Sequence, residues 1–339
     1  MDNNPAKNFV RAALYSGLAD FRAVLQSAPG SPAPVAIYLP GIQNLEAPFL
    51  AAAGLDVWGA ERDRKTLARM TRPSATHPAD PARVFAGTLR DAVLAHARER
   101  RPRALFVNAD FEGEICAIAD DLLSVFSVFP AQEGGMLAIT TLAGRDPVSI
   151  DDGLLYASAL DSAVEQDLWP IIDRSSRRWR RYGKQHGNPS DVWHAQVARD
   201  MALLWRVVLG IGMVEHPADA AGSVRAKLRE GLREEVFRLL RDFEHIKGIG
   251  NGKQQLPRLA SPAIAWVFEQ THTPIVPYTM ARWVTHGRAG QNRMTTWHLT
   301  FVRVTPPVSW KTSASKLVDL YQASPLVYVD DAGAPHRIT

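Results

Sequence analysis

Five short apolar segments, each preceded by a helical pattern, occupy the first 145 residues, and this alternation constrains the fold most. The helical patterns fall at 5–28, 44–53, 60–70, 88–100 and 114–128. The apolar segments are 35–39 (VAIYL), 55–59 (LDVWG), 82–87 (ARVFAG), 103–109 (RALFVNA) and 134–144 (GGMLAITTLAG). Strands that alternate with helices are typical of βαβ units and a parallel sheet. The sequence therefore predicts an open, mostly parallel α/β domain. Asn44 is predicted to cap the second helix.

The alternation stops near residue 150. Residues 150–270 are mostly helical in pattern, at 161–181, 191–208 and 223–246. Two β-rich runs then flank the polar connector HGRAGQNR, and they indicate an antiparallel hairpin over 275–285 and 294–304. A short helix at 314–321, a strand at 326–329, a turn and a tail complete the expected order.

Composition excludes several classes of protein. Hydrophobic residues make up 46% of the chain and charged residues 22%, which are the values of a globular protein. No apolar run reaches the roughly 18–20 residues of a membrane span, and the N-terminus lacks a secretory pattern. The single cysteine, Cys116, excludes a disulfide framework and is expected to be a small buried hydrophobe. We expect a cytoplasmic protein with no membrane partner and of undetermined oligomeric state.

Three strand ends carry turn or polar residues. Pro40 and Gly41 follow the first strand, Glu61 follows the second, and 108–113 (NADFEG) follows the fourth. Open parallel sheets bind ligands outside the carboxyl ends of their strands. We therefore expect a nucleotide-cofactor site where the strands beginning near Val35, Leu55 and Ala104 end.

The order of five β/α units, a helical insertion and a terminal hairpin resembles that of the class I S-adenosylmethionine-dependent methyltransferases. The resemblance implies a Rossmann-like core formed by 1–149 and 274–305. It also implies a helical insertion for substrate recognition over 150–273 and an extension over 306–339. The loop LPGIQNLE with the later Glu-Arg pair looks like a divergent branch of phage and mobile-element enzymes.

The resemblance implies S-adenosylmethionine as cofactor. Glu61 lies 20 residues beyond Gly41, where the family keeps a carboxylate for the ribose hydroxyls, with Arg62 beside it. The first loop has one glycine where the family has several. Pro40 and Gly41 are predicted to form the turn, and Glu46 is predicted to replace the missing acid if it points back. Gly87 and Thr88 are the expected neighbours of the adenine. The alternative for Glu61 is a solvated residue of the ERDRK charge run.

The loop after the fourth strand corresponds to the family's catalytic loop. Amino-methylating nucleic-acid enzymes carry Asn or Asp, two prolines and an aromatic residue there, and this chain lacks the prolines. Asn108 or Asp110 is predicted to accept a hydrogen bond from the target amino group, Phe111 to stack on a flat substrate, and Glu112 to take a chemical role. The alternative is that Asp110 only caps the helix that follows.

Charge is unevenly distributed along the chain. Residues 1–150 hold 15 Lys+Arg and 16 Asp+Glu, which leaves 24 Lys+Arg and 19 Asp+Glu for residues 151–339. A dense basic segment with interleaved aromatic residues is the composition of a nucleic-acid surface. The residues predicted to bind nucleic acid, DNA or RNA, are Arg174, Arg177, Arg178, Trp179, Arg180, Arg181 and Lys184, with Arg288 and Arg293 from the hairpin. A solvated helix end remains the alternative.

The sequence contains no HExxH, GxSxG or GxxxxGK[ST] motif, and its ten histidines have no metal-ligand spacing. We predict a nucleic-acid methyltransferase that holds no metal. Two alternatives remain open. One is a methyltransferase-like module that has lost the cofactor and only binds nucleic acid or protein. The other is a nucleotide-modifying enzyme in which Asp110, Glu112 and Glu114 bind a divalent metal.

Overall fold

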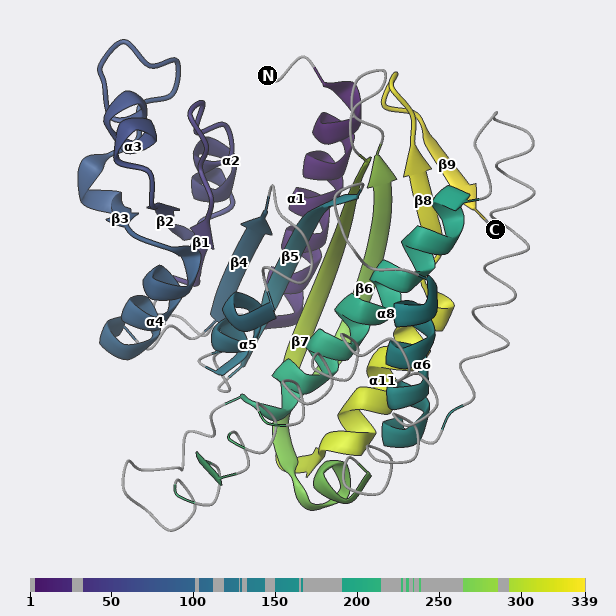
Figure 1. Cartoon of the computed structure of the whole chain (residues 1–339). Helices are drawn as coiled ribbons and strands as arrows, with labels where there is room; N and C mark the ends of the chain where they lie inside the picture. The colour runs from purple at the N-terminus through teal and green to yellow at the C-terminus, as the bar shows by residue number, and fades with distance from the viewer. Residues whose placement is uncertain are drawn as a thin grey trace. The chain divides into compact units, whose positions relative to one another are not determined.

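The computed structural model describes most of the chain (Figure 1). Described are residues 4–25, 33–100, 104–111, 119–127, 129, 133–143, 150–164, 166, 191–214, 265–285 and 293–338, with single residues between 227 and 238. The first elements are α1 (Pro5–Leu25), β1 (Val35–Tyr38), α2 (Ala47–Ala52), β2 (Asp56–Glu61), α3 (Arg64–Met70), η1 (Pro81–Arg83), β3 (Val84–Ala86), α4 (Leu89–Arg100), β4 (Ala104–Asp110), α5 (Ala119–Ser127) and β5 (Gly134–Ala143). The later ones are α6 (Ile150–Val164), α8 (Asp191–Gly212), β6 (His272–Thr285), β7 (Arg293–Ser309), α11 (Trp310–Ala323), β8 (Leu326–Val329) and β9 (Pro335–Ile338).

The strands form one sheet in the order β3-β2-β1-β4-β5-β7-β6-β8-β9. Strands β1 to β5 pair in parallel, and β7 pairs antiparallel with β5. The prediction of a Rossmann-like, mostly parallel sheet with a C-terminal antiparallel hairpin and a large helical insertion is therefore confirmed. One strand was not predicted: β9 lies in the segment that the sequence pattern assigns to a tail.

The strand order reverses at β1, and this reversal positions the site. β1 pairs with β2 on one side and β4 on the other, so that Tyr38 lies beside both Gly59 and Asn108. After β1 the chain builds β2 and β3 on one side of it, and it then crosses over to build β4 and β5 on the other side. Such a switch point leaves a crevice at the carboxyl ends of the strands, where open α/β sheets bind ligands.

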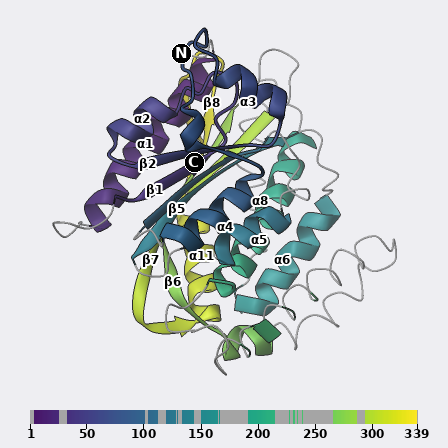
Figure 2. The same cartoon turned by 90° about the vertical axis from the view of Figure 1, so that its left-hand side faces the viewer.

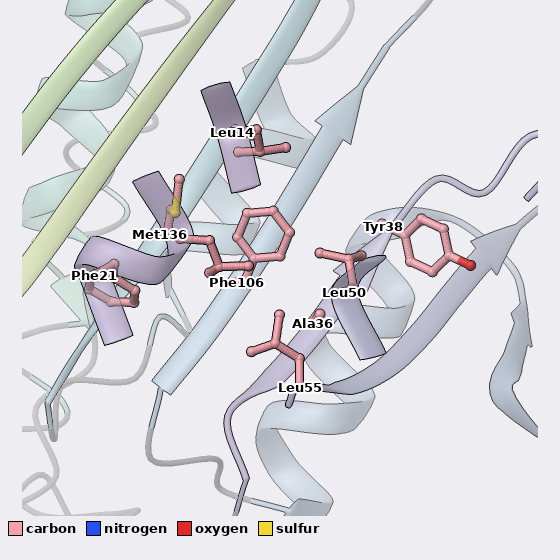
Figure 3. Packing of buried hydrophobic residues seen from close by; sticks show 10 residues of the cluster. Leu14, Phe21, Ala36, Tyr38, Leu50, Leu55, Phe106 and Met136 are labelled. Atoms are coloured by element: carbon pink, nitrogen blue, oxygen red, sulfur yellow. The ribbon is translucent and has the colours of Figure 1, made fainter. Parts of the chain in front are cut away.

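Helices α1 and α2 cover one face of the parallel strands. The apolar stripe Leu14, Leu18 and Phe21 of α1 packs on side chains that alternate along β1, β4 and β5, among them Phe106 and Met136 (Figure 3). Residues two apart on a strand face the same side, whereas residues three or four apart on a helix share a stripe. Both patterns place apolar side chains on the surfaces that meet, so the helix and the strands bury this face of the sheet.

Helices α4 and α5 cover the opposite face (Figure 2). Phe126 of α5, Phe129 and Phe301 of β7 form a buried cluster with ring centroids 5.5–5.6 Å apart. The start of β5 approaches this cluster closely, because a Cβ added to Gly135 would lie 2.0 Å from the Phe129 ring. Gly134 has a positive φ of 135° and lies against the Phe301 carbonyl, so glycine is required at both positions.

The chain divides into two compact units. The first contains residues 1–145, 277–303 and 324–337, and the second contains 146–276, 304–323 and the last two residues. In this division residues 306–323 belong to the second unit, and the predicted roles of core and insertion stay predictions. Within the second unit, α6 begins at Ile150 rather than at the predicted Asp161. Gly153 lets α6 approach α8 closely, because a Cβ there would lie 2.5 Å from the Ala198 Cα.

Candidate functional site

A cavity of about 1070 Å³ lies at the carboxyl ends of β1, β2, β3 and β4. All of its lining residues belong to the first unit. Among them are the residues predicted from the sequence to hold a cofactor, together with two of the predicted catalytic residues. These are Pro40, Gly41, Glu46, Glu61, Arg62, Gly87, Thr88, Asp110 and Phe111. The structure thus brings these residues to one cavity, and their roles in binding and catalysis stay predictions.

The loop between β1 and α2 contains two left-handed residues. Gly41 has a φ of 56° and Asn44 a φ of 46°. The predicted helix cap at Asn44 is wrong, because the residue that precedes α2 is Glu46. Asn44 instead lies buried in the turn, where its side-chain oxygen accepts a hydrogen bond from the Tyr38 hydroxyl. Asparagine tolerates this backbone conformation, which explains its use in a turn rather than at a cap.

Glu46 turns back toward the sheet. Its carboxyl accepts a hydrogen bond from the Asn108 amide and lies 3.5 Å from Nε of Arg11. Burial raises the pKa of the Glu46 carboxyl, and the Asp110 carboxylate raises it further, while Arg11 and Asn108 lower it in part. Glu46 and Asp110 therefore form a pair of carboxyl groups that interact electrostatically.

Glu61 is the last residue of β2, paired in register with Ala86 of β3. One of its carboxylate oxygens accepts the Asp63 backbone N–H at 2.8 Å. Asp63 in turn caps α3 by accepting the backbone N–H groups of Lys65 and Thr66. Glu61 is therefore held at the cavity wall by the turn into α3, which begins four residues later than the predicted helix.

Asn108 and Asp110 lie on β4, and Phe111 follows the strand directly. The Phe111 backbone N–H donates to the carbonyl of Thr140 on β5 at 2.9 Å. Glu112 and Glu114 lie outside the described residues, as does the start of the helix that Asp110 was predicted to cap. Among the described residues, no group of three or more His, Cys, Asp or Glu side chains could hold a metal ion.

A second, smaller cavity of about 40 Å³ adjoins the first, and we call it the polar chamber. It shares Lys7, Arg11, Glu46 and Asp110 with the large cavity. Its walls also come from α1, β4, β5, β6 and β7. These further lining residues are Val10, Leu14, Asn108, Thr140, Thr285, Met294, Thr296 and His298.

His298 is a residue of this site that the sequence reasoning missed. It lies on β7 opposite Ala138, is 5% exposed, and its ring centroid lies 4.2 Å from that of Trp283. Burial lowers the pKa of its imidazole to about 3, so the ring is neutral at physiological pH. Its Nε2 atom is buried without a hydrogen-bond partner among the described residues. The alternation in TTWHLT places Thr296 on the same face, which is the signal that could have revealed the pair.

The predicted nucleic-acid surface falls largely outside the described part of the chain. This holds for all residues from Arg174 to Lys184 and for Arg288. Arg293 is the first residue of β7 and pairs with Ala143, and its side chain is not described. Within the described part, no helix is long and apolar enough to cross a membrane.

The chain matches no protein-family model, and it matches no curated protein. Among solved structures it is similar to the cyclopropane synthase MmaA2 from Mycobacterium tuberculosis. The identity is 10%, the match covers 84% of each chain, and the TM-score is 0.27. A likeness this distant carries no argument, so the fold assignment rests on the strand order and register described above.

Proposed function

We propose that this protein is an S-adenosylmethionine-dependent methyltransferase. One observation carries the proposal: Glu61, the Pro40–Gly41 turn and the Gly87–Thr88 segment line the same cavity at the switch point of a Rossmann-like sheet. These segments are far apart in the sequence, and the fold brings them to one edge of the sheet. Strand β7, which lies between β5 and β6 and is antiparallel to β5, is the part of the sheet that favours a methyltransferase over other Rossmann-like folds.

The residues of the cavity fit this cofactor. The Glu61 carboxylate lies at the end of β2, where it can accept two hydrogen bonds from a vicinal diol. Gly41 keeps the first loop free of a side chain, so the backbone can approach the ligand, and Gly87 and Thr88 lie on the side expected for the adenine. When bound, the cofactor supplies a methyl group on a sulfonium, and the chain's own task is to align donor and acceptor.

The volume leaves room for an acceptor. Small-molecule sites typically measure about 300–1000 Å³, and this cavity of about 1070 Å³ exceeds that range slightly. Cations from two helices, Lys7 and Arg11 of α1 and Arg69 of α3, line it together with Arg62. These cations and the basic surplus of residues 151–339 support a nucleic acid as the acceptor.

Isothermal titration calorimetry with S-adenosylmethionine and S-adenosylhomocysteine tests the proposal. We expect binding in the micromolar range, and Glu61→Gln should weaken it by about 10- to 100-fold, the value of hydrogen bonds to a charged group. Asp20→Asn, an exposed acid on α1 outside the cavity, is the matched control and should leave the affinity unchanged. Absence of heat at high micromolar ligand would refute the proposed cofactor.

A further inference from the structure

A third cavity of the first unit plays no part in the proposed function. Its volume of about 690 Å³ lies within the roughly 300–1000 Å³ that is typical of small-molecule sites. We call it the α2 pocket, because α2 forms one wall, while β1, β2, β3 and the segment around η1 form the others. Its described lining residues all belong to the first unit, and none of them lines the large cavity or the polar chamber.

Small side chains leave this space open. Helix α2 is six residues long and lines the pocket with Ala47 and Ala51. On β2, Gly59 has no side chain, and Val57 is partly buried. Parallel sheets of this kind are normally covered on both faces. The pocket therefore leaves apolar surface of the sheet uncovered, and a ligand with an apolar body would bury that surface.

The buried residues of the α2 pocket form its inner wall. Leu55 and Ala79 are apolar residues of this wall. Its polar side chains Tyr38 and Asn44 are paired, because the Tyr38 hydroxyl donates a hydrogen bond to the side-chain oxygen of Asn44. The inner wall therefore suits the apolar part of a ligand.

The charged side chains of the pocket lie on its solvent-exposed side. The Arg83 side chain is 50% exposed and pairs with Asp56, whose side chain is 23% exposed. Asp80 is exposed, and one of its oxygens accepts the Ala82 backbone N–H at 2.9 Å. Two carboxylates against one guanidinium give this side of the pocket a net negative charge. It therefore attracts a cation and repels an anion.

We propose that the α2 pocket is a ligand site, separate from the proposed cofactor site, for a small apolar molecule that carries one cationic nitrogen. The apolar body packs against Leu55 and Val57, and the nitrogen lies beside the second carboxylate oxygen of Asp80. The loop between β1 and α2 divides the two sites, since Asn44 lines the α2 pocket while Gly41 lines the large cavity. The α2 pocket is present whatever the large cavity binds, so the two proposals fail independently.

Probes with the same ring and different charge test the ligand class at neutral pH. They are naphthylmethylamine, naphthylmethanol and naphthoate, all substituted at the same ring position, and NMR titration of their signals gives each Kd. We expect the amine to bind with a Kd of about 0.1–1 mM, as small ligands of this size do. An exposed ion pair strengthens binding by about two- to fivefold, so the alcohol should bind more weakly than the amine by that factor, and the carboxylate more weakly still.

The other results overturn the proposal. A carboxylate that binds as tightly as the amine would show that the pocket does not select a cation. Absence of binding by all three probes at about 1 mM would show that the pocket is no site for an apolar body.

A matched pair of variants locates the amine. Ala51→Trp fills the pocket from α2 and should weaken binding of the amine by about tenfold or more. Ala52→Trp is the control, because Ala52 is exposed on the same helix and does not line the pocket. Unchanged binding in Ala51→Trp, or equal loss in Ala52→Trp, would place the amine elsewhere and overturn the proposed site.

Asp80→Asn tests the charge without removing the cap of η1, because asparagine is also a good cap. The amine should lose its advantage of about two- to fivefold and bind as the alcohol does, while the Kd of the alcohol stays the same. An amine that keeps its advantage in this variant would refute the pairing with Asp80.

Discussion

His298 should make the protein unstable in mild acid, and His298→Gln should remove part of that instability. The folded chain keeps the imidazole neutral, with a pKa of about 3, whereas an unfolded histidine has a pKa of about 6.5. Below pH 6.5 the unfolded chain therefore binds more protons, and the free energy of unfolding falls as the pH falls toward 3. The slope is about 1.4 kcal/mol per pH unit, which gives about 2.7 kcal/mol between pH 7.5 and 4.5.

Glu46 acts in the opposite direction. Its pKa is raised in the folded chain, so the stability it contributes is greatest in acid and is lost as the pH rises through the folded pKa. The His298→Gln variant keeps Glu46, and the difference between the two proteins therefore isolates the histidine.

Urea unfolding of both proteins, followed by fluorescence at pH 7.5, 6.5, 5.5 and 4.5, measures this difference. We expect the two stability curves to diverge below pH 6.5 by about 2.7 kcal/mol in total by pH 4.5. Trp283 contacts the His298 ring, so part of the signal from the nine tryptophans comes from the unit in which the change is made. Parallel curves for the two proteins would refute the buried, neutral imidazole.

Three further predictions concern the stability of the first unit. Gly135→Ala should cost about 1–3 kcal/mol or more in urea unfolding, because its Cβ would lie 2.0 Å from the Phe129 ring; a neutral effect would mean that this ring moves freely. Phe301→Ala should cost about 3–5 kcal/mol, since Phe301 contacts both Phe126 and Phe129 edge-on, and a loss below 1 kcal/mol would contradict a tightly packed cluster. Asp63→Ala should cost about 1 kcal/mol, measured as a lower Tm, through loss of the α3 cap, and an unchanged Tm would show that this helix adds nothing to the cooperative unit.

Local patterning predicts most of this fold because the buried strands are short apolar runs separated by helices. The sequence places β1, β4 and β8 almost where the structure has them. It misses β9, since PHRI contains a single large apolar residue and becomes a strand by lying beside β8 at the sheet edge. When a strand is stabilised mainly by pairing with its neighbour, its sequence need not show the alternation of apolar and polar residues by which strands are predicted.

The sequence likewise predicts one part of the candidate site and misses another. Glu61, Gly41 and Asp110 follow predicted strands directly, so the rule on strand ends is enough to bring them together. His298 could be placed only by the antiparallel register of β5 and β7, which sets Thr296 against Thr140 and carries the imidazole into the chamber. A register shift of one residue would turn both side chains to the other face of the sheet. Register is a property of the paired strands and cannot be read from either strand alone.

The first loop shows how one glycine can replace several. A Cβ at Gly41 would meet nothing within 4 Å, so the backbone conformation, and not a lack of space, calls for glycine there. The second left-handed position is taken by Asn44, whose side chain is fixed by the Tyr38 hydroxyl. The loop thereby has a second tight turn and a side-chain hydrogen bond to β1, which a further glycine could not make. Glu46 follows that turn and accepts a hydrogen bond from Asn108, so the loop contributes one of the residues that line both the large cavity and the polar chamber.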